Sequence, residues 1–154
     1  MSIGASGIGK TEMLQTMARS ERVHGCVKTI GVDFVSINTT HLKIQVWDAG
    51  GHNEYDGMLN AFKRNVEVTL LCYSDGDIPS FEWAREKHID GKFIVINLSK
   101  TNMPVASSLM HSRNCMGGIT YTPDNWALAR AQLTSLLQPA SSPDHKPRCS
   151  CTLL

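Results

Sequence analysis

The feature that most constrains this chain lies near its start, where glycines surround a lysine and a threonine. Residues 4–11 read Gly-Ala-Ser-Gly-Ile-Gly-Lys-Thr and satisfy the pattern G-x-x-x-x-G-K-[ST] in full. Glycines let backbone N–H groups turn toward phosphate oxygens, and the helix that follows adds the positive end of its dipole. The pattern predicts a phosphate-binding loop made by Gly4, Ser6, Gly7, Ile8, Gly9, Lys10 and Thr11.

Two side chains of this loop carry the chemistry that the pattern requires. Lys10 would neutralise the β- and γ-phosphates of a nucleotide, and the hydroxyl of Thr11 would bind Mg²⁺. The loop alone is compatible with a kinase, an ATPase or a GTPase, so other segments must decide between these classes.

Apolar periodicity divides the chain into alternating strands and helices. We expect strands at residues 32–37, 42–47, 66–72, 93–98 and 119–121, with a hairpin turn at 38–41. We expect helices at residues 10–19 and 79–88, a short helix within 103–118 that ends near Asn114, and a last helix with Thr122 as its N-cap. The apolar face of that last helix comprises Trp126, Ala129, Leu133, Leu136 and Leu137. Such alternation predicts an α/β fold with a mostly parallel sheet and helices on both faces.

The length and composition indicate one domain followed by a tail. The 154 residues carry a net charge of +1, which gives no reason to expect nucleic-acid binding. No apolar run approaches the roughly 18 residues of a membrane span. We assign residues 1–137 to the domain and 138–154, which are rich in Pro, Ser and charge, to a flexible tail.

Two further segments resemble the switch regions of small GTPases. Residues 29–34, Thr-Ile-Gly-Val-Asp-Phe, resemble the first switch of the Rab family, and Thr29 lies nineteen residues after Lys10, which is similar to the family spacing. Residues 47–55, Trp-Asp-Ala-Gly-Gly-His-Asn-Glu-Tyr, resemble the second switch of the Ras superfamily. The resemblance favours a small GTPase over a kinase or an ATPase. It implies the three-layer α/β/α fold of P-loop NTPases.

The resemblance also implies a set of ligand contacts. Thr29 would contact Mg²⁺ and the γ-phosphate, Asp48 would hold Mg²⁺ through water, and the Gly51 amide would bond the γ-phosphate. The expected cofactors are GTP or GDP with Mg²⁺, whose protein ligands would be Thr11, Thr29 and Asp48. Loss of the γ-phosphate would release residues 29–36 and 51–60, through which effector proteins would bind.

The residue that would orient the attacking water departs from the family pattern. Family members usually carry Gln after the second-switch glycine, whereas this chain has His52. Translation-type GTPases use His at this place, so His52 would position water together with Thr29 and Lys10, or be an ordinary exposed loop residue. We expect slow intrinsic hydrolysis.

Base recognition departs from the pattern as well. The guanine-reading motif Asn-Lys-x-Asp is replaced by residues 97–100, Asn-Leu-Ser-Lys, and we assign Asn97 and Lys100 to base contact. In a second register, residues 99–102, Ser-Lys-Thr-Asn, keep the lysine but end in Asn. Either register lacks the carboxylate that accepts two hydrogen bonds from guanine. Residues 120–122, Thr-Tyr-Thr, stand where the family has Ser-Ala-Lys.

The first strand is nearly absent, because three residues precede Gly4. Loss of a central strand would leave its neighbours with unpaired backbone groups, so we expect marginal stability for a chain that begins at Met1.

The last four residues, Cys151-Thr-Leu-Leu, fit a prenylation pattern with Leu favouring geranylgeranyl, and Cys149 would be a second lipid site. A prenyltransferase and membrane lipid are therefore expected partners, on the cytosolic face of a membrane.

Two hypotheses remain open. The first is a lipid-anchored GTP-dependent switch in vesicle traffic or signalling, and the second is a pseudo-GTPase that acts as a binding scaffold.

Overall fold

The fold is built on one mixed sheet of six strands. The computed structural model describes residues 1–51 and 61–138, and its sheet has the strand order β2-β3-β1-β4-β5-β6. The strands are β1 (Ser2–Ile3), β2 (Val32–Asn38), β3 (Lys43–Ala49), β4 (Val68–Tyr73), β5 (Lys92–Leu98) and β6 (Cys115–Tyr121). β2 pairs with β3 in antiparallel register, and the pairings among the other strands are parallel. The mostly parallel sheet and the hairpin at its edge are as predicted.

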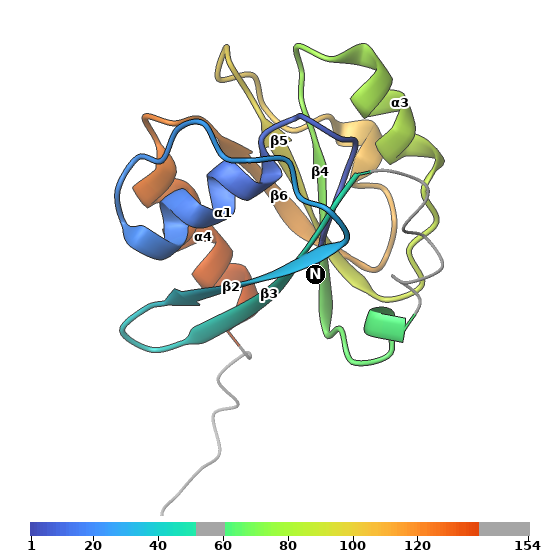
Figure 1. Ribbon diagram of the computed structural model, residues 1–154. Coiled ribbons are helices and arrows are strands. Elements are labelled where there is room, and N and C mark those ends of the chain that lie inside the picture. Colours follow the sequence, from blue (N-terminus) through green and yellow to red (C-terminus); the bar gives the residue numbers. More distant parts are fainter. Residues whose placement is uncertain (52–60, 139–154) are drawn as a thin grey trace, which may run out of the picture.

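Helices cover both faces of this sheet (Figure 1). Helices α1 (Lys10–Arg19) and α4 (Trp126–Leu137) lie on one face, and α3 (Ile78–Glu86) lies on the other. The larger apolar core contains Met13, Leu14 and Met17 of α1 together with Leu133 of α4, all fully buried. A second core packs α3 against the opposite face of β4 and β5. The three-layer α/β/α architecture and the helix expected at residues 10–19 are therefore confirmed.

The two-residue strand β1 occupies the centre of the sheet between β3 and β4. Ser2 is paired with Asp48 on one side and with Leu70 on the other. The Met1 carbonyl extends this pairing, because it accepts a hydrogen bond from the Leu70 amide at 2.7 Å. The Met1 amino group donates to the Val68 carbonyl at 3.0 Å. β1 is as short as the sequence indicated, but it still bonds to both neighbours where they flank the phosphate loop.

The structure corrects the prediction of a short helix within residues 103–118. A three-residue 3₁₀ turn, η2 (Ser107–Leu109), is the helical element there, and β6 begins at Cys115 rather than at residue 119. Two adjacent glycines, Gly117 and Gly118, lie inside this strand, although glycine is disfavoured in strand interiors. A Cβ on Gly118 would lie 2.7 Å from the Met110 sulfur, and one on Gly117 would lie 3.1 Å from Leu136. These glycines allow β6 to be covered closely on both faces.

The start of α4 also differs from the prediction. The helix begins at Trp126 with Asn125 as its N-cap residue, not at Pro123 behind Thr122. Thr122 and Asn125 bond to each other instead: the Thr122 amide donates to Asn125 Oδ1 at 2.8 Å, and the Asn125 amide donates to Thr122 Oγ1 at 3.2 Å. This reciprocal pair holds residues 122–125 in a non-helical turn. The helix therefore begins at Trp126, three residues later than predicted. The predicted apolar face of α4 packs against the larger core as expected.

Within the described ranges, none of the helices is long and apolar enough to cross a membrane.

Candidate functional site

The candidate site lies where β1 and β3 end and α1 begins. Because β1 and β3 are parallel neighbours, their carboxyl ends meet at one edge of the sheet, as in other open α/β folds. The phosphate loop follows β1, and Asp48 lies near the end of β3. A pocket of about 360 Å³ opens between them. It is lined by Ser6, Gly7, Gly9, Lys10, Thr11, Glu12, Cys26, Val27, Lys28, Thr29, Ala49, Gly50 and Gly51.

Three side chains that the sequence assigned to Mg²⁺ come together here: Thr11 and Thr29 line the pocket, and the buried Asp48 bonds to both. Thr11 Oγ1 donates to Asp48 Oδ2 at 2.5 Å, and it lies 2.8 Å from Thr29 Oγ1. Thr29 Oγ1 also donates to Asp48 Oδ2, at 3.4 Å. These residues come from a helix, a loop and a strand, and the carboxylate of Asp48 is fully buried. The buried carboxylate and the two hydroxyls around its Oδ2 atom form a compact set of oxygen atoms that can act as ligands for a hard cation.

That donor set fits magnesium better than it fits a transition metal. Mg²⁺ prefers oxygen ligands, keeps several waters, and is commonly held by one or two protein groups together with substrate phosphates. No group of three or more His, Cys, Asp or Glu side chains that could hold a metal occurs among residues 1–51 and 61–138. Binding of the cation would replace the hydrogen bonds among Thr11, Thr29 and Asp48 by coordination, directly or through water.

The Lys10 ammonium is buried against its own loop. Its Nζ donates to the carbonyls of Gly4 at 2.9 Å and Ala5 at 2.8 Å. Burial lowers the pKa of Lys10, while nearby Cys72 and Asp48 oppose part of that shift. An ammonium has three N–H donors, so one remains for an anion in the pocket. A polyphosphate in the pocket would place negative charge next to this buried ammonium and stabilise it.

Gly51 lies directly on the phosphate loop. A Cβ at this position would lie 2.3 Å from the Ser6 nitrogen and 2.5 Å from the Gly4 carbonyl oxygen, so no larger residue fits in this arrangement. The close approach brings the beginning of the second switch-like segment against the loop that would hold the phosphates. A ligand in the pocket would therefore touch both segments at once.

The residues assigned to base reading do not reach this pocket. The Asn97 side chain is fully buried: its Nδ2 donates to the Met103 carbonyl at 2.9 Å and to Asp75 Oδ2 at 3.5 Å, and its Oδ1 accepts from the Asp75 amide at 3.1 Å. The Lys100 side chain is exposed. Neither residue lines the pocket. Asn97 thus ties the ends of β4 and β5 together and has both N–H groups occupied.

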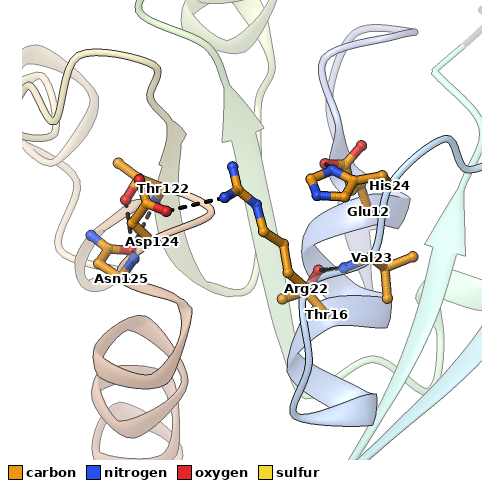
Figure 2. A network of polar contacts seen from close by, with 8 residues as sticks. All are labelled: Glu12, Thr16, Arg22, Val23, His24, Thr122, Asp124 and Asn125. Carbon is orange, nitrogen blue, oxygen red and sulfur yellow. Dashed lines mark hydrogen bonds and ion pairs between the residues drawn. The ribbon is translucent and has the colours of Figure 1, made fainter.

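The segment at residues 120–122 is occupied in a similar way. Tyr121 is buried in the larger core, and burial raises the pKa of its phenol. The Thr120 carbonyl accepts a hydrogen bond from Asn125 Nδ2 at 3.1 Å. Figure 2 shows Arg22, from the segment after α1, extending toward Asp124 in the turn before α4, with 3.2 Å between Nη1 and Oδ1. This exposed pair bridges the two segments but contributes little stability.

Several sequence assignments lie outside the described residues. These are His52, the rest of the segment 52–60, and the tail cysteines Cys149 and Cys151.

Sequence reasoning missed Ser2 and six residues of the pocket lining, which are Glu12, Cys26, Val27, Lys28, Ala49 and Gly50. Ser2 Oγ, fully buried, donates to Asp48 Oδ1 at 2.6 Å and so holds the second oxygen of that carboxylate. Cys26 and Lys28 line the pocket beside Thr29. Only the proximity of residues 26–28 to Thr29 in sequence could have indicated them, and Ser2 carried no signal, because its role depends on the register between β1 and β3.

Comparisons with known proteins agree with this geometry. The sequence profile described as the Ras family matches residues 1–103. Ras-related protein Rab-25 of Mus musculus is 29% identical over 125 residues, which cover 74% of this chain and 59% of that protein. Rab-25 of Homo sapiens is 37% identical over 75 residues, covering 46% of this chain and 35% of that protein. Ras-related protein RABA2d of Arabidopsis thaliana is 31% identical over 104 residues, which cover 61% of this chain and 48% of that protein. The chain spans about three fifths or less of the length of these relatives.

Proposed function

This chain belongs to the Ras family of small GTPases and is most similar to its Rab branch, and from that premise we propose that it binds GTP and GDP with Mg²⁺ and acts as a molecular switch in membrane traffic. The observation that carries the proposal is the convergence of Thr11, Thr29 and Asp48 on one point beside Lys10. The tail would anchor the switch to the cytosolic face of a membrane through lipid on Cys151, with Cys149 as a second lipid site.

Each residue of the pocket has a separate task in this proposal. The phosphate-loop amides and Lys10 bind the phosphates, and the Thr11 hydroxyl and Asp48 orient the cation. The cation, held by Thr11, Thr29 and Asp48, would supply positive charge that neutralises the phosphates. Thr29 and the Gly51 amide sense the γ-phosphate, because each belongs to a segment that reaches the pocket from a different side. Loss of that phosphate removes the contact that both segments share.

The switch would report its state through an aromatic surface on β2 and β3, the hairpin whose strand β3 ends at the pocket. The rings of Phe34 on β2 and Trp47 on β3 lie 5.0 Å apart between centroids with an interplanar angle of 60°, and the two residues are 44% and 36% exposed. Phe62 lies against Trp47 at 5.1 Å. Exposed aromatic clusters of this kind are typical of protein-binding surfaces. We assign effector binding to residues 29–36 and 51–60, of which 52–60 lie outside the described residues.

Asp48→Asn tests the magnesium part of the proposal. The amide keeps the size of the side chain but removes the charge that would hold the cation, so Mg²⁺ should no longer strengthen GTP binding. We expect 5 mM Mg²⁺ to increase GTP affinity at least about tenfold in the unchanged protein and less than about twofold in the variant. Titration calorimetry with and without EDTA measures both values.

The matched control is Asp33→Asn, because Asp33 is an exposed carboxylate on the adjacent strand β2. It should leave the magnesium effect unchanged. Equal magnesium effects in the unchanged protein and in Asp48→Asn, with both folded by circular dichroism, would remove Asp48 from the proposed site.

A non-cycling scaffold is the second candidate. The buried Asn97 amide favours it, because an amide whose hydrogen bonds are all made within the protein does not contact a base.

Single-turnover phosphate release separates the candidates. For a cycling switch we expect slow but measurable release that His52→Gln accelerates at least about tenfold, since Gln orients the attacking water in the family. His41→Gln, on the exposed hairpin turn, is the control and should have no effect. Absence of release from both His52 and Gln forms would establish the scaffold.

A further inference from the structure

The loop that follows β5 is folded inward around a carboxylate of its own. Ser99 Oγ, which is almost fully buried, donates to Asp75 Oδ2 and accepts from the amides of Thr101 and Met103, each at 3.1 Å. Thr101 Oγ1 donates to the same Asp75 oxygen at 3.0 Å. Burial alone would raise the pKa of Asp75, but the hydrogen bonds from Ser99, Thr101 and Asn97 outweigh it and lower that pKa. The carboxylate therefore stays ionised and holds the loop after β5 in place through these hydrogen bonds.

Asp75 does not substitute for the missing guanine-reading carboxylate in this arrangement. Bidentate recognition of a base needs both oxygens, and Oδ2 already receives hydrogen bonds from three side chains. Oδ1 has no hydrogen-bond partner among the described residues, but it is buried away from solvent. A purine would reach this oxygen only if the loop opened and lost its hydrogen bonds.

The second loop that would surround a base is also internally bonded. Thr122 and Asn125 bond reciprocally (Figure 2). Asn125 Nδ2 also donates to the Thr120 carbonyl. The Arg22 and Asp124 side chains meet across the space between this turn and α1. The side chains of Thr122 and Asn125 are thus bonded within the turn, Thr120 Oγ1 donates to the Met103 carbonyl at 3.1 Å, and Asp124 is paired with Arg22.

The pocket covers only the part of the site that would hold the phosphates. Its lining comes from the phosphate loop, Glu12 of α1, residues 26–29 and residues 49–51, and it includes none of residues 97–101 or 120–125. Its volume of about 360 Å³ lies near the lower end of the roughly 300–1,000 Å³ range for small-molecule pockets. The groups that converge on it, Lys10 and the Thr11, Thr29 and Asp48 cluster, recognise phosphate and its cation, and none of them recognises a base.

We infer that the site selects its ligand by the polyphosphate chain and its magnesium ion and is nearly indifferent to the base, so that ATP and inorganic tripolyphosphate bind it about as well as GTP. The inference rests on the proposed function, since it concerns the same pocket. Discrimination between bases arises when buried polar groups of a site are left unpaired by the wrong ligand. Here those polar groups are already paired within the protein, except for Asp75 Oδ1, which is buried away from a ligand. The wrong base therefore leaves no group unsatisfied that the right base would pair.

The test is titration calorimetry of the full chain with GTP, ATP and sodium tripolyphosphate, each with 5 mM Mg²⁺. We expect the Kd values for GTP and ATP to agree within about threefold, and that for tripolyphosphate to lie within about tenfold of them. Lys10→Met should weaken all three ligands by a similar factor, which would assign the binding to this pocket. A GTP preference over ATP of more than threefold would overturn the inference while leaving the proposed function intact.

Other outcomes separate the two claims further. Binding of GTP and ATP with equal Kd values but no binding of tripolyphosphate would also overturn the inference, because the nucleoside would then be required. No heat with any of the three ligands, in a sample with a cooperative thermal melt, would contradict the proposed function itself and with it the inference.

Discussion

Replacement of Lys10 by methionine is expected to weaken the binding of Mg²⁺·GTP about a hundredfold or more, which corresponds to about 2.7 kcal/mol. The ammonium is buried in the pocket and has one N–H donor left after its bonds to Gly4 and Ala5. A charge-assisted hydrogen bond to a phosphate is worth about 1.5–3 kcal/mol, and loss of the long-range attraction adds to it. Titration calorimetry measures the change.

The same substitution should not lower the stability of the ligand-free protein. Burial already lowers the pKa of Lys10, which means that the folded chain holds this cation at a cost. Methionine has a similar length and no charge to desolvate, which offsets the loss of the two hydrogen bonds to the Gly4 and Ala5 carbonyls, so we expect Tm to change by less than about 3 °C. This separation of binding from stability distinguishes a ligand-binding lysine from a structural one.

Lys43→Met provides the control, because Lys43 is an exposed cation on β3 outside the lining of the pocket. It should leave GTP affinity within about twofold of the unchanged protein. Equal losses in both variants would mean that only net charge matters, and unchanged affinity in Lys10→Met would remove the phosphate loop from ligand binding.

Gly4→Ala is expected to lower the free energy of unfolding by about 3 kcal/mol, which lowers Tm by about 10 °C. An added Cβ would lie 2.5 Å from the Cys72 carbonyl oxygen and 3.1 Å from the Ile8 side chain. The first of these is backbone of the central strand β4, so it cannot move aside as a flexible side chain would. The chain must instead shift the phosphate loop away from the sheet. Chemical denaturation and a thermal melt measure the loss.

Gly91→Ala is the matched control. Gly91 precedes β5, and a Cβ there would have no atom within 4 Å. Its Tm should lie within about 2 °C of the unchanged protein, or above it, because alanine restricts the unfolded chain. If Gly4→Ala were as stable as Gly91→Ala, the close packing of the phosphate loop on β4 would be contradicted. GTP affinity of Gly4→Ala should fall as well, since displacement of the loop misplaces its amides.

Most of the fold was predictable because its signals are local. The apolar stripe of α1 and the alternation in the β2–β3 hairpin lie within single segments, and the structure contains both elements within two residues of their predicted bounds. The unbroken apolar runs of β4 and β5 likewise indicated strands covered on both faces. One failure, the start of β6, depended on residues outside the strand, because Leu136 and Met110 pack over Gly117 and Gly118. The other, the start of α4, depended on a local choice, because Thr122 bonds to Asn125 instead of capping a helix that begins at Pro123.

The sequence by itself determined which chemical groups the site contains: a lysine and a threonine beside glycine turns, and a second threonine and an aspartate at family-like spacing. The tertiary structure decided which groups meet. Parallel pairing of β1 with β3 brings Asp48 to Ser2 and Thr11, and the same folding commits Asn97 to Asp75 and Met103. The physical reason is that each hydrogen bond joins two particular groups, and these groups can lie far apart in the sequence. A sequence indicates which groups can donate or accept, but only packing decides which of these bonds form and which groups remain for a ligand.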